Sequence, residues 1–151
     1  MTTIRPFHLA VPVDDLAAAR RFYGEILGCR EGRSADTWID FDLFGHQFVA
    51  HLKPKESTGA NADKDDRAAG EITNSVQGHD VPVPHFGVVL TLADWRELRA
   101  RLEAHDVPFP VPPHVRWPGQ PGEQATLFVR DPAGNALEFK GMDDLSQLFA
   151  K

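Results

Sequence analysis

The feature that constrains the fold most is an internal duplication. An apolar strand, a helix and a pair of strands follow one another near the N-terminus, and the same order returns in the second half of the chain. Placing His8 on His85 aligns the two leading strands at an offset of 85 − 8 = 77 residues and preserves their alternation of faces. Because 151 residues suit one domain, we expect a single domain over 1–151 with modules at 4–53 and 81–142.

The first module begins with PFHLAVPV, which alternates as a strand with one core face does. The positions expected in the core are Phe7, Leu9, Val11 and Val13. A helix follows in DDLAAARRFYGEILG, with Asp14 or Asp15 as its N-cap and Gly28 at its end. TWIDFDLF and HQFVAHL complete the module as two strands joined by a tight turn at Gly45.

The second module repeats this order, with a strand in VPVPHFGVVL and a helix in TLADWRELRARLEAHD. EQATLFVR and NALEFK form a strand pair that turns at DPAG. The segment PFPVPPHVRWPGQPG predicts an edge strand, because a strand with one unpaired side tolerates prolines. Between the modules, residues 54–80 form a polar loop without periodicity, which predicts either a lid over an active site or a solvated insertion.

Charge and composition narrow the classes of function. The net charge of −6 offers no basic stripe, so we expect neither nucleic acid nor an anionic membrane surface as a partner. The sequence contains no apolar run of signal-peptide or membrane-spanning type. The single cysteine, Cys29, excludes an intrachain disulfide. A soluble, cytoplasmic protein is the expectation.

Four side chains that can bind a metal occupy like positions in the predicted strands. Alternate residues of a strand face opposite ways, and these four face away from the predicted core: His8, His51, His85 and Glu138. A carboxylate between two core residues is costly unless a cation meets it, which favours a shared metal ion. Taken singly, each histidine also fits a hydrogen-bonded structural role and the glutamate a solvent-exposed one, so both interpretations stay open.

Other side chains lie at alternating strand positions that face the same way as these four, where they could line a cleft around the metal. We expect these to contact a substrate: Trp38, Arg116, Phe128 and Arg130. His114 shares a parity with Arg116 in the proline-rich strand and is a further candidate.

Three segments resemble the vicinal oxygen chelate superfamily of glyoxalases, bleomycin resistance proteins and extradiol dioxygenases: FHLAVPVDDLAAARRFYGEILG, VPHFGVVL and DPAGNALEF. The last is the most specific, because the family places a metal-binding glutamate seven residues after this aspartate, where Glu138 follows Asp131. The resemblance implies an α+β fold of two βαβββ modules whose curled mixed sheet surrounds a metal cleft. It also implies His8, His85 and Glu138 as ligands of one divalent ion, with Fe(II) favoured and Mn, Ni, Zn or Co possible.

The residue at position 51 separates the subgroups of this family. Glyoxalase-like members usually carry a second carboxylate near this place, whereas this chain has His51. The resemblance therefore favours an extradiol-type dioxygenase that acts on a small substrate and O₂, with His51 as catalytic acid or base, and implies a homodimer. A glyoxalase-like lyase or isomerase, a resistance-type transferase and a non-catalytic small-molecule binding protein are the alternatives.

Overall fold

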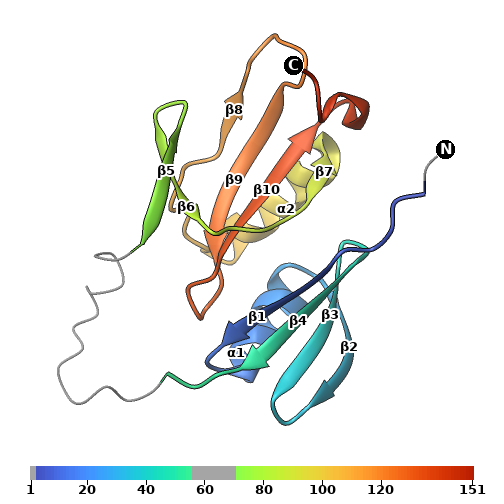
Figure 1. Ribbon diagram of the computed structural model, residues 1–151, viewed down its shortest axis with the longest axis vertical. Helices are drawn as coiled ribbons and strands as arrows, with labels where there is room; N and C mark the ends of the chain where they lie inside the picture. The colour runs from blue at the N-terminus through green and yellow to red at the C-terminus, as the bar shows by residue number, and fades with distance from the viewer. Residues whose placement is uncertain (1–2, 56–70) are drawn as a thin grey trace. The chain divides into compact units, whose positions relative to one another are not determined.

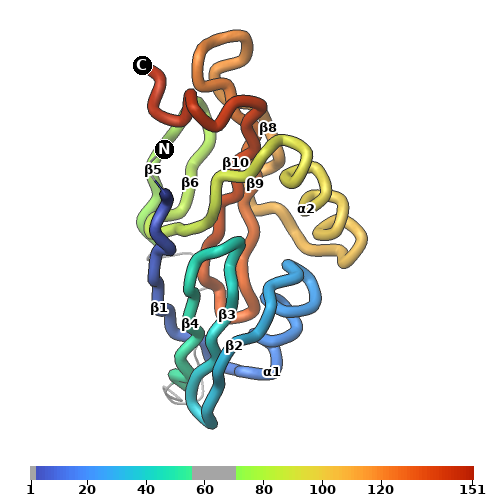
Figure 2. Tube along the Cα trace, turned by 90° about the vertical axis from the view of Figure 1, so that its right-hand side faces the viewer, coloured from blue at the N-terminus to red at the C-terminus, as the bar shows by residue number. Residues whose placement is uncertain are grey.

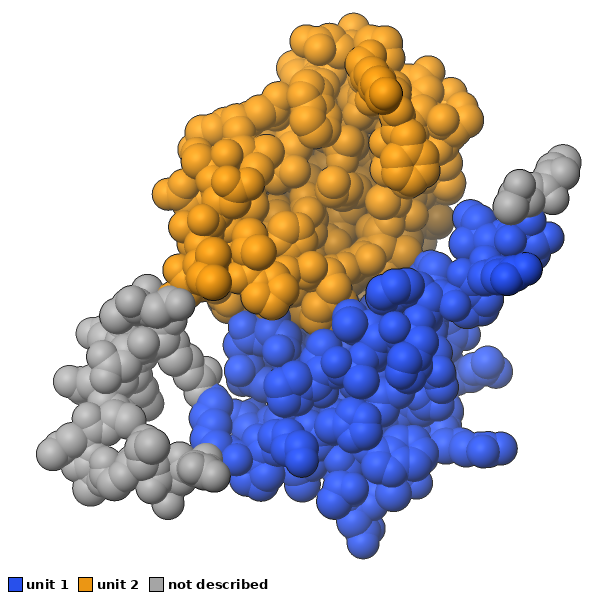
Figure 3. Space-filling model, viewed as in Figure 1, with its two compact units in different colours: residues 1–55, 131–135 blue, residues 56–130, 136–151 orange. Residues whose placement is uncertain are grey.

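The computed structural model of the chain describes residues 3–55 and 71–151. The chain divides into two compact units, residues 1–55 with 131–135 and residues 56–130 with 136–151 (Figure 3). Each unit contains one four-stranded mixed sheet built from the element order β-α-β-β-β. This confirms the predicted α+β class and the two βαβββ modules. None of the helices in the described part of the chain is long and apolar enough to cross a membrane.

The first unit contains six elements (Figure 1): β1 (His8–Val13), α1 (Leu16–Ala19), η1 (Arg20–Ile26), β2 (Arg30–Ala35), β3 (Trp38–Leu43) and β4 (His46–Leu52). Its sheet has the order β1-β4-β3-β2, in which β1 runs parallel to β4. The tight β3–β4 turn has positive φ angles at Phe44 and Gly45, the conformation that favours glycine and joins twisted strands.

The predicted helix of the first unit is present, with two hydrogen-bonding patterns. Asp15 caps it by accepting hydrogen bonds from the N–H groups of Ala17 and Ala18. From Arg20 to Ile26 the helix is of the π type, and Gly28 follows with a φ of 78°. The buried side of the helix packs its aromatic residues with those of the sheet, namely Phe22, Tyr23, Phe41 and Phe48. The core of this unit is therefore aromatic.

Strand alternation fails at two places in the first unit. Phe7 is 64% exposed, because β1 begins only at His8 and the buried alternation starts after it. Alternation also gave no sign of β2, the further strand that the βαβββ resemblance implied, because every side chain of REGRSA is exposed and the segment lacks an apolar alternation. It is an edge strand, paired only with β3.

The second unit contains the remaining elements: β5 (Ile72–Val76), β6 (His79–Val83), β7 (Val89–Thr91), α2 (Leu92–Ala104), β8 (His114–Arg116), β9 (Gln124–Arg130), β10 (Ala136–Met142) and η2 (Leu145–Gln147). Its four-stranded sheet has the order β7-β10-β9-β8 and repeats the topology of the first, with β7 parallel to β10. The proline-rich β8 is an edge strand, as predicted. In Figure 2, α2 lies on one side of this sheet and the β5–β6 hairpin on the other.

The loop predicted at 54–80 is wrong in its second part. Residues 72–83 form the β5–β6 hairpin, which turns at Gln77 and Gly78. Its strands, ITNSV and HDVPV, are mostly polar and gave no periodic signal. The rest of the predicted loop includes residues 56–70, which lie outside the described residues, and the lid prediction stays untested there.

The strand predicted at 81–90 is divided. Its first residues belong to β6 and its last to β7, and between them Phe86 forms an isolated parallel bridge with Leu137 of β10. The Glu138 N–H donates to the Phe86 carbonyl at 2.8 Å. At Gly87 the two backbones approach so closely that an added Cβ would lie 1.6 Å from the Glu138 carbonyl oxygen. The absence of a side chain at Gly87 therefore lets residues 85–87 lie directly against Glu138.

Candidate functional site

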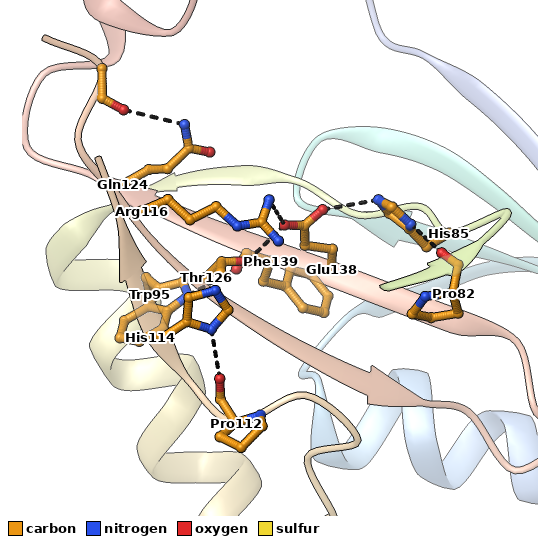
Figure 4. A network of polar contacts seen from close by, with 11 residues as sticks. Pro82, His85, Trp95, Pro112, His114, Arg116, Gln124, Thr126, Glu138 and Phe139 are labelled. Carbon is orange, nitrogen blue, oxygen red and sulfur yellow. Dashed lines mark hydrogen bonds and ion pairs between the residues drawn. The ribbon is translucent and has the colours of Figure 1, made fainter. Parts of the chain in front are cut away.

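Glu138 and His85 form an ion pair in the second unit (Figure 4). Glu138 lies in the middle of β10 and is 7% exposed. The Nε2 atom of His85 lies 3.0 Å from Oε2 of Glu138. Both atoms are acceptors when His85 is neutral with its proton on Nδ1, so a proton or another cation must lie between them.

The second oxygen of Glu138 is held from the opposite side. Thr126 Oγ1 donates to Oε1 at 2.7 Å, and Arg116 Nη1 lies 3.3 Å from the same oxygen. Burial on its own raises the pKa of Glu138, but the hydrogen bonds from His85 and Thr126, aided by the charges of Lys140 and Arg116, outweigh burial and lower it. Glu138 is thus an ionised carboxylate with one oxygen engaged and the other directed at His85.

His85 is oriented by a backbone carbonyl. Its Nδ1 lies 2.6 Å from the Pro82 oxygen, and because a carbonyl only accepts, Nδ1 carries the proton. The hydrogen bond with Glu138 raises the pKa of His85, and the Pro82 contact adds to this, while partial burial opposes it. A histidine whose Nδ1–H is held in this way presents Nε2, which is the usual arrangement of a metal-binding histidine.

In the first unit, His8 is held by a chain of side chains. Gln47 Nε2 donates to Asp40 at 3.1 and 3.2 Å, which directs the amide oxygen of Gln47 to His8 Nδ1 at 2.8 Å. With the amide oriented by the carboxylate, Oε1 accepts and His8 Nδ1 donates. His8 therefore carries a proton on Nδ1, as His85 does, and its Nε2 is the nitrogen that would bind a metal.

Strand register places His51 and Trp38 on the face of the first sheet that carries His8. His8 pairs with Gln47 in β4, and His51 lies two steps of two residues further along that strand. Trp38 is directly opposite His51 in β3. His51 is exposed and Trp38 is half-buried. The predicted sharing of a face by these three side chains is therefore correct within this unit.

The duplication identifies the counterpart of Glu138 in the first sheet. Leu9 pairs with Phe48, and its repeat partner Phe86 pairs with Leu137. Val49 follows Phe48 in β4, and Glu138 follows Leu137 in β10, so these two residues correspond. Val49 is buried and cannot bind a metal. His51 lies two residues beyond the position that corresponds to Glu138.

The other predicted site residues of the second unit share the face of Glu138 but have different surroundings. Phe128 is opposite Glu138 in β9, is 1% exposed, packs with Val81 and Val111, and meets His85 edge to face at 5.2 Å. Arg130 forms an ion pair with Glu71 at 2.5 Å. The face thus collects the predicted His85, Arg116, Phe128 and Glu138 in direct contact with one another or with shared neighbours.

The three predicted ligands are of the types that a divalent ion binds. Two imidazoles and one ionised carboxylate are donors of the kind that such ions take, and each of the three side chains is held by a further hydrogen bond, at His8 Nδ1, His85 Nδ1 and Glu138 Oε1. Taken alone, neither unit brings three His, Cys, Asp or Glu side chains of the described ranges together. His8 lies in one unit and His85 with Glu138 in the other.

Three supporting groups were not expected. Gln47 and Thr126 lie on the same strand faces as the site residues, so strand alternation alone could have identified them. The Pro82 carbonyl could not be identified from sequence, because its contact with His85 depends on the path of the backbone between β6 and β7. All three hold a candidate ligand.

Comparisons with known proteins agree with this fold. The model of the Glyoxalase/Bleomycin resistance protein/Dioxygenase superfamily matches residues 5–139, and the chain belongs to this superfamily. No curated protein sequence matches the chain.

Several solved structures share the fold. A glyoxalase/bleomycin resistance protein/dioxygenase from Alicyclobacillus acidocaldarius is 28% identical, with 96% of each chain covered and a TM-score of 0.71. A lactoylglutathione lyase from Agrobacterium tumefaciens is 24% identical over the whole of both chains, with a TM-score of 0.63. A genomically encoded fosfomycin resistance protein from Listeria monocytogenes is 14% identical, with 99% of each chain covered and a TM-score of 0.61. At these identities, the last two show the fold alone.

Proposed function

We propose that the chain is a mononuclear divalent-metal enzyme, in first place an extradiol-type dioxygenase, with His8, His85 and Glu138 as ligands. The observation that carries the proposal is the approach of His85 Nε2 to Glu138 Oε2 at 3.0 Å, with each side chain held from behind. Two imidazoles and one carboxylate are the usual host of Fe(II) in oxygen chemistry, so we expect Fe(II). Mn, Ni, Zn or Co would suit the same donors.

When bound, the ion would supply Lewis-acid activation and, as Fe(II), a reaction with O₂ for a small substrate that reaches it through two neighbouring oxygens. The residues of the chain have separate tasks. Thr126 and Arg116 engage Oε1 of Glu138 and leave Oε2 for the ion. The Pro82 carbonyl and the Gln47 side chain hold Nδ1–H of His85 and His8, which leaves each Nε2 as the nitrogen that would bind the ion.

His51 is the proposed proton-transfer group. It is exposed on the face of the first sheet that carries His8, and an imidazole can both accept and donate a proton. In this role it takes the proton of a substrate hydroxyl and returns it later in the reaction. The proposed substrate contacts are Trp38, Arg116, Phe128 and Arg130.

A lyase, an isomerase or a resistance-type transferase on the same metal is the second candidate. The names of the similar lactoylglutathione lyase and fosfomycin resistance proteins motivate it. Against the glyoxalase-like form stands Val49, which occupies the place that corresponds to Glu138 in the first sheet and offers no second carboxylate. A binding protein without catalysis is the third candidate.

Metal analysis combined with an O₂-uptake screen tests the proposal. We expect about one divalent ion per purified chain, its loss in Glu138→Ala and its retention in His105→Ala, whose histidine is exposed at the end of α2. Consumption of O₂ with a catechol-type substrate would support the dioxygenase. A metal-bound chain that turns over without O₂ would favour the lyase or isomerase. A chain that never holds a stoichiometric ion would contradict the proposal.

Two further parts of the proposal concern the oligomeric state of the protein and its location in the cell. We expect a homodimer, as the family resemblance implies, and a cytoplasmic location. The mass in solution, measured by light scattering on the full chain, tests the first of these.

A further inference from the structure

Arg116 is a buried cation with unused hydrogen-bond donors. It is 5% exposed, and its Nη1 faces Glu138. Its Nε and Nη2 atoms are also buried, and neither has a hydrogen-bond partner among the residues that the structure describes. Nε and Nη2 together form one edge of the planar guanidinium, and such an edge binds a carboxylate through two parallel hydrogen bonds. Buried donors are normally hydrogen-bonded, so the two unpaired donors of this edge indicate a binding site for a ligand.

Two residues at neighbouring strand positions carry unpaired acceptors. The Nδ1–H of His114 donates to the Pro112 carbonyl at 2.8 Å, so its buried Nε2 is a free acceptor. The amide nitrogen of Gln124 donates to the Gly122 carbonyl at 3.2 Å, which leaves its buried Oε1 as a second free acceptor. These atoms and the two of Arg116 are the unpaired buried side-chain atoms found across residues 3–55 and 71–151.

The four atoms belong to neighbouring positions on one face of the sheet. Arg116 is directly opposite Gln124 across β8 and β9, and His114 is opposite Thr126 in the same ladder. Directly opposite residues of an antiparallel pair have Cβ atoms about 4.5–5.5 Å apart, so their side chains meet. Figure 4 shows Arg116, His114 and Gln124 on one side of Glu138, with His85 and Pro82 on the other. The positive charge of Lys140, which also acts on Glu138, favours an anion here.

We propose that these four atoms bind a carboxylate with a hydroxyl group close to it. The carboxylate occupies the Nε–Nη2 edge of Arg116, and the hydroxyl donates to His114 Nε2 or Gln124 Oε1. The substrate of the proposed enzyme is then a hydroxycarboxylate; this assignment rests on the proposed function, whereas the subsite lies within the second unit alone.

The β5–β6 hairpin covers the subsite. The His79 ring stacks on His114 with centroids 4.0 Å apart, and Val76 and Val81 pack with Phe128. Entry of the carboxylate therefore requires this hairpin to separate from the sheet.

Glycolate, the smallest hydroxycarboxylate, is a direct probe. On the full chain labelled with ¹⁵N, both as purified and after chelator treatment, glycolate should shift the Arg116 Nε–H signal and reach saturation. Acetate, which lacks the hydroxyl, should bind about 3- to 10-fold more weakly, and neutral glycolamide should not saturate the site. Arg116→Gln should weaken glycolate binding about 10- to 100-fold, and Arg116→Lys, which keeps the charge without the two-nitrogen edge, should weaken it as well. Arg101→Gln, an exposed arginine in the last turn of α2, is the control that should bind glycolate as the unchanged chain does.

Equal binding of glycolate and glycolamide, unchanged binding in Arg116→Lys, or no shift at any concentration would overturn the subsite. Glycolate binding that requires the metal would also overturn it, since the ion would then be the binding partner. Saturable binding to a chain that never holds an ion would leave the subsite standing and contradict the proposed metal enzyme.

Discussion

His85 Nε2 and Glu138 Oε2 lie 3.0 Å apart. Contacts between the two backbones fix this approach. Glu138 N–H donates to the carbonyl of Phe86, the neighbour of His85, and Gly87 permits the close approach. The pair is therefore part of the β10 ladder rather than a chance meeting of two flexible side chains. A pair held so rigidly offers two donor atoms to a cation without reorganisation.

Replacing Gln47 with Met should lower metal affinity about 10- to 100-fold, the usual effect of removing a group that orients a ligand. Gln47 accepts from His8 Nδ1–H at 2.8 Å, and its loss frees the ring to rotate and change tautomer. Competition with a metal-binding dye measures the affinity. Gln120→Met, at an exposed position, is the matched control and should leave the affinity unchanged. Equal affinity in the two variants would remove His8 from the site.

The His51→Gln variant should keep its metal while turnover falls about 10²–10⁴-fold, the range expected for a lost acid or base. His51 is exposed, so the change should leave the free energy of unfolding nearly unaltered. Metal content and single-turnover rate are measured on one preparation. Loss of the metal in this variant would instead make His51 a ligand and overturn the dioxygenase-like assignment.

Gly87→Ala should destabilise the fold by about 1–3 kcal/mol, because the new methyl group would overlap the Glu138 carbonyl and push β10 away. Gly24→Ala is the matched control: its nearest neighbour would be the Cys29 carbonyl oxygen at 3.9 Å, and alanine suits a helix better than glycine. Urea unfolding of both variants measures the difference. If Gly87→Ala were as stable as Gly24→Ala, the close approach of the two backbones would be wrong.

The buried hydroxyl of Tyr23 leads us to expect that the free energy of unfolding of the first unit falls at alkaline pH. Its hydroxyl donates to Asp131 Oδ2 at 2.8 Å, and burial, followed by the Asp131 charge, raises its pKa well above 10.0. The folded chain then holds a proton that the unfolded chain releases above about pH 10, so this stabilising contribution is complete below that pH and falls as pH rises towards the folded-state pKa.

Tyr23→Phe should therefore unfold more easily at neutral pH, by about 1.5–3 kcal/mol for a hydrogen bond to a charged group, and should show a shallower decline above pH 10. Urea unfolding at several pH values measures both effects. An unchanged alkaline slope in Tyr23→Phe would assign the decline to other groups.

Much of the site could be predicted because strands have a period of two. Alternation alone placed His8, His51 and Trp38 on one face, and Glu138 with Phe128 on another, as the registers confirm. Strand alternation could not predict the contacts that depend on how strands distant in the sequence pair with one another. The position of Arg116 beside Glu138 requires the pairing of β8, β9 and β10, and the proline- and glycine-rich segment between β8 and β9 leaves that pairing undetermined in the sequence. Edge and hairpin strands without an apolar side, β2 and β5, carry no alternation to detect.

The most direct test of the account is the location of the metal in crystals of the full chain grown with a divalent ion, by anomalous diffraction at the absorption edge of that ion. We expect one ion per chain bound by His8 Nε2, His85 Nε2 and Glu138 Oε2. An ion bound without His8, or a stoichiometric ion elsewhere with His85 and Glu138 still paired only to each other, would contradict it.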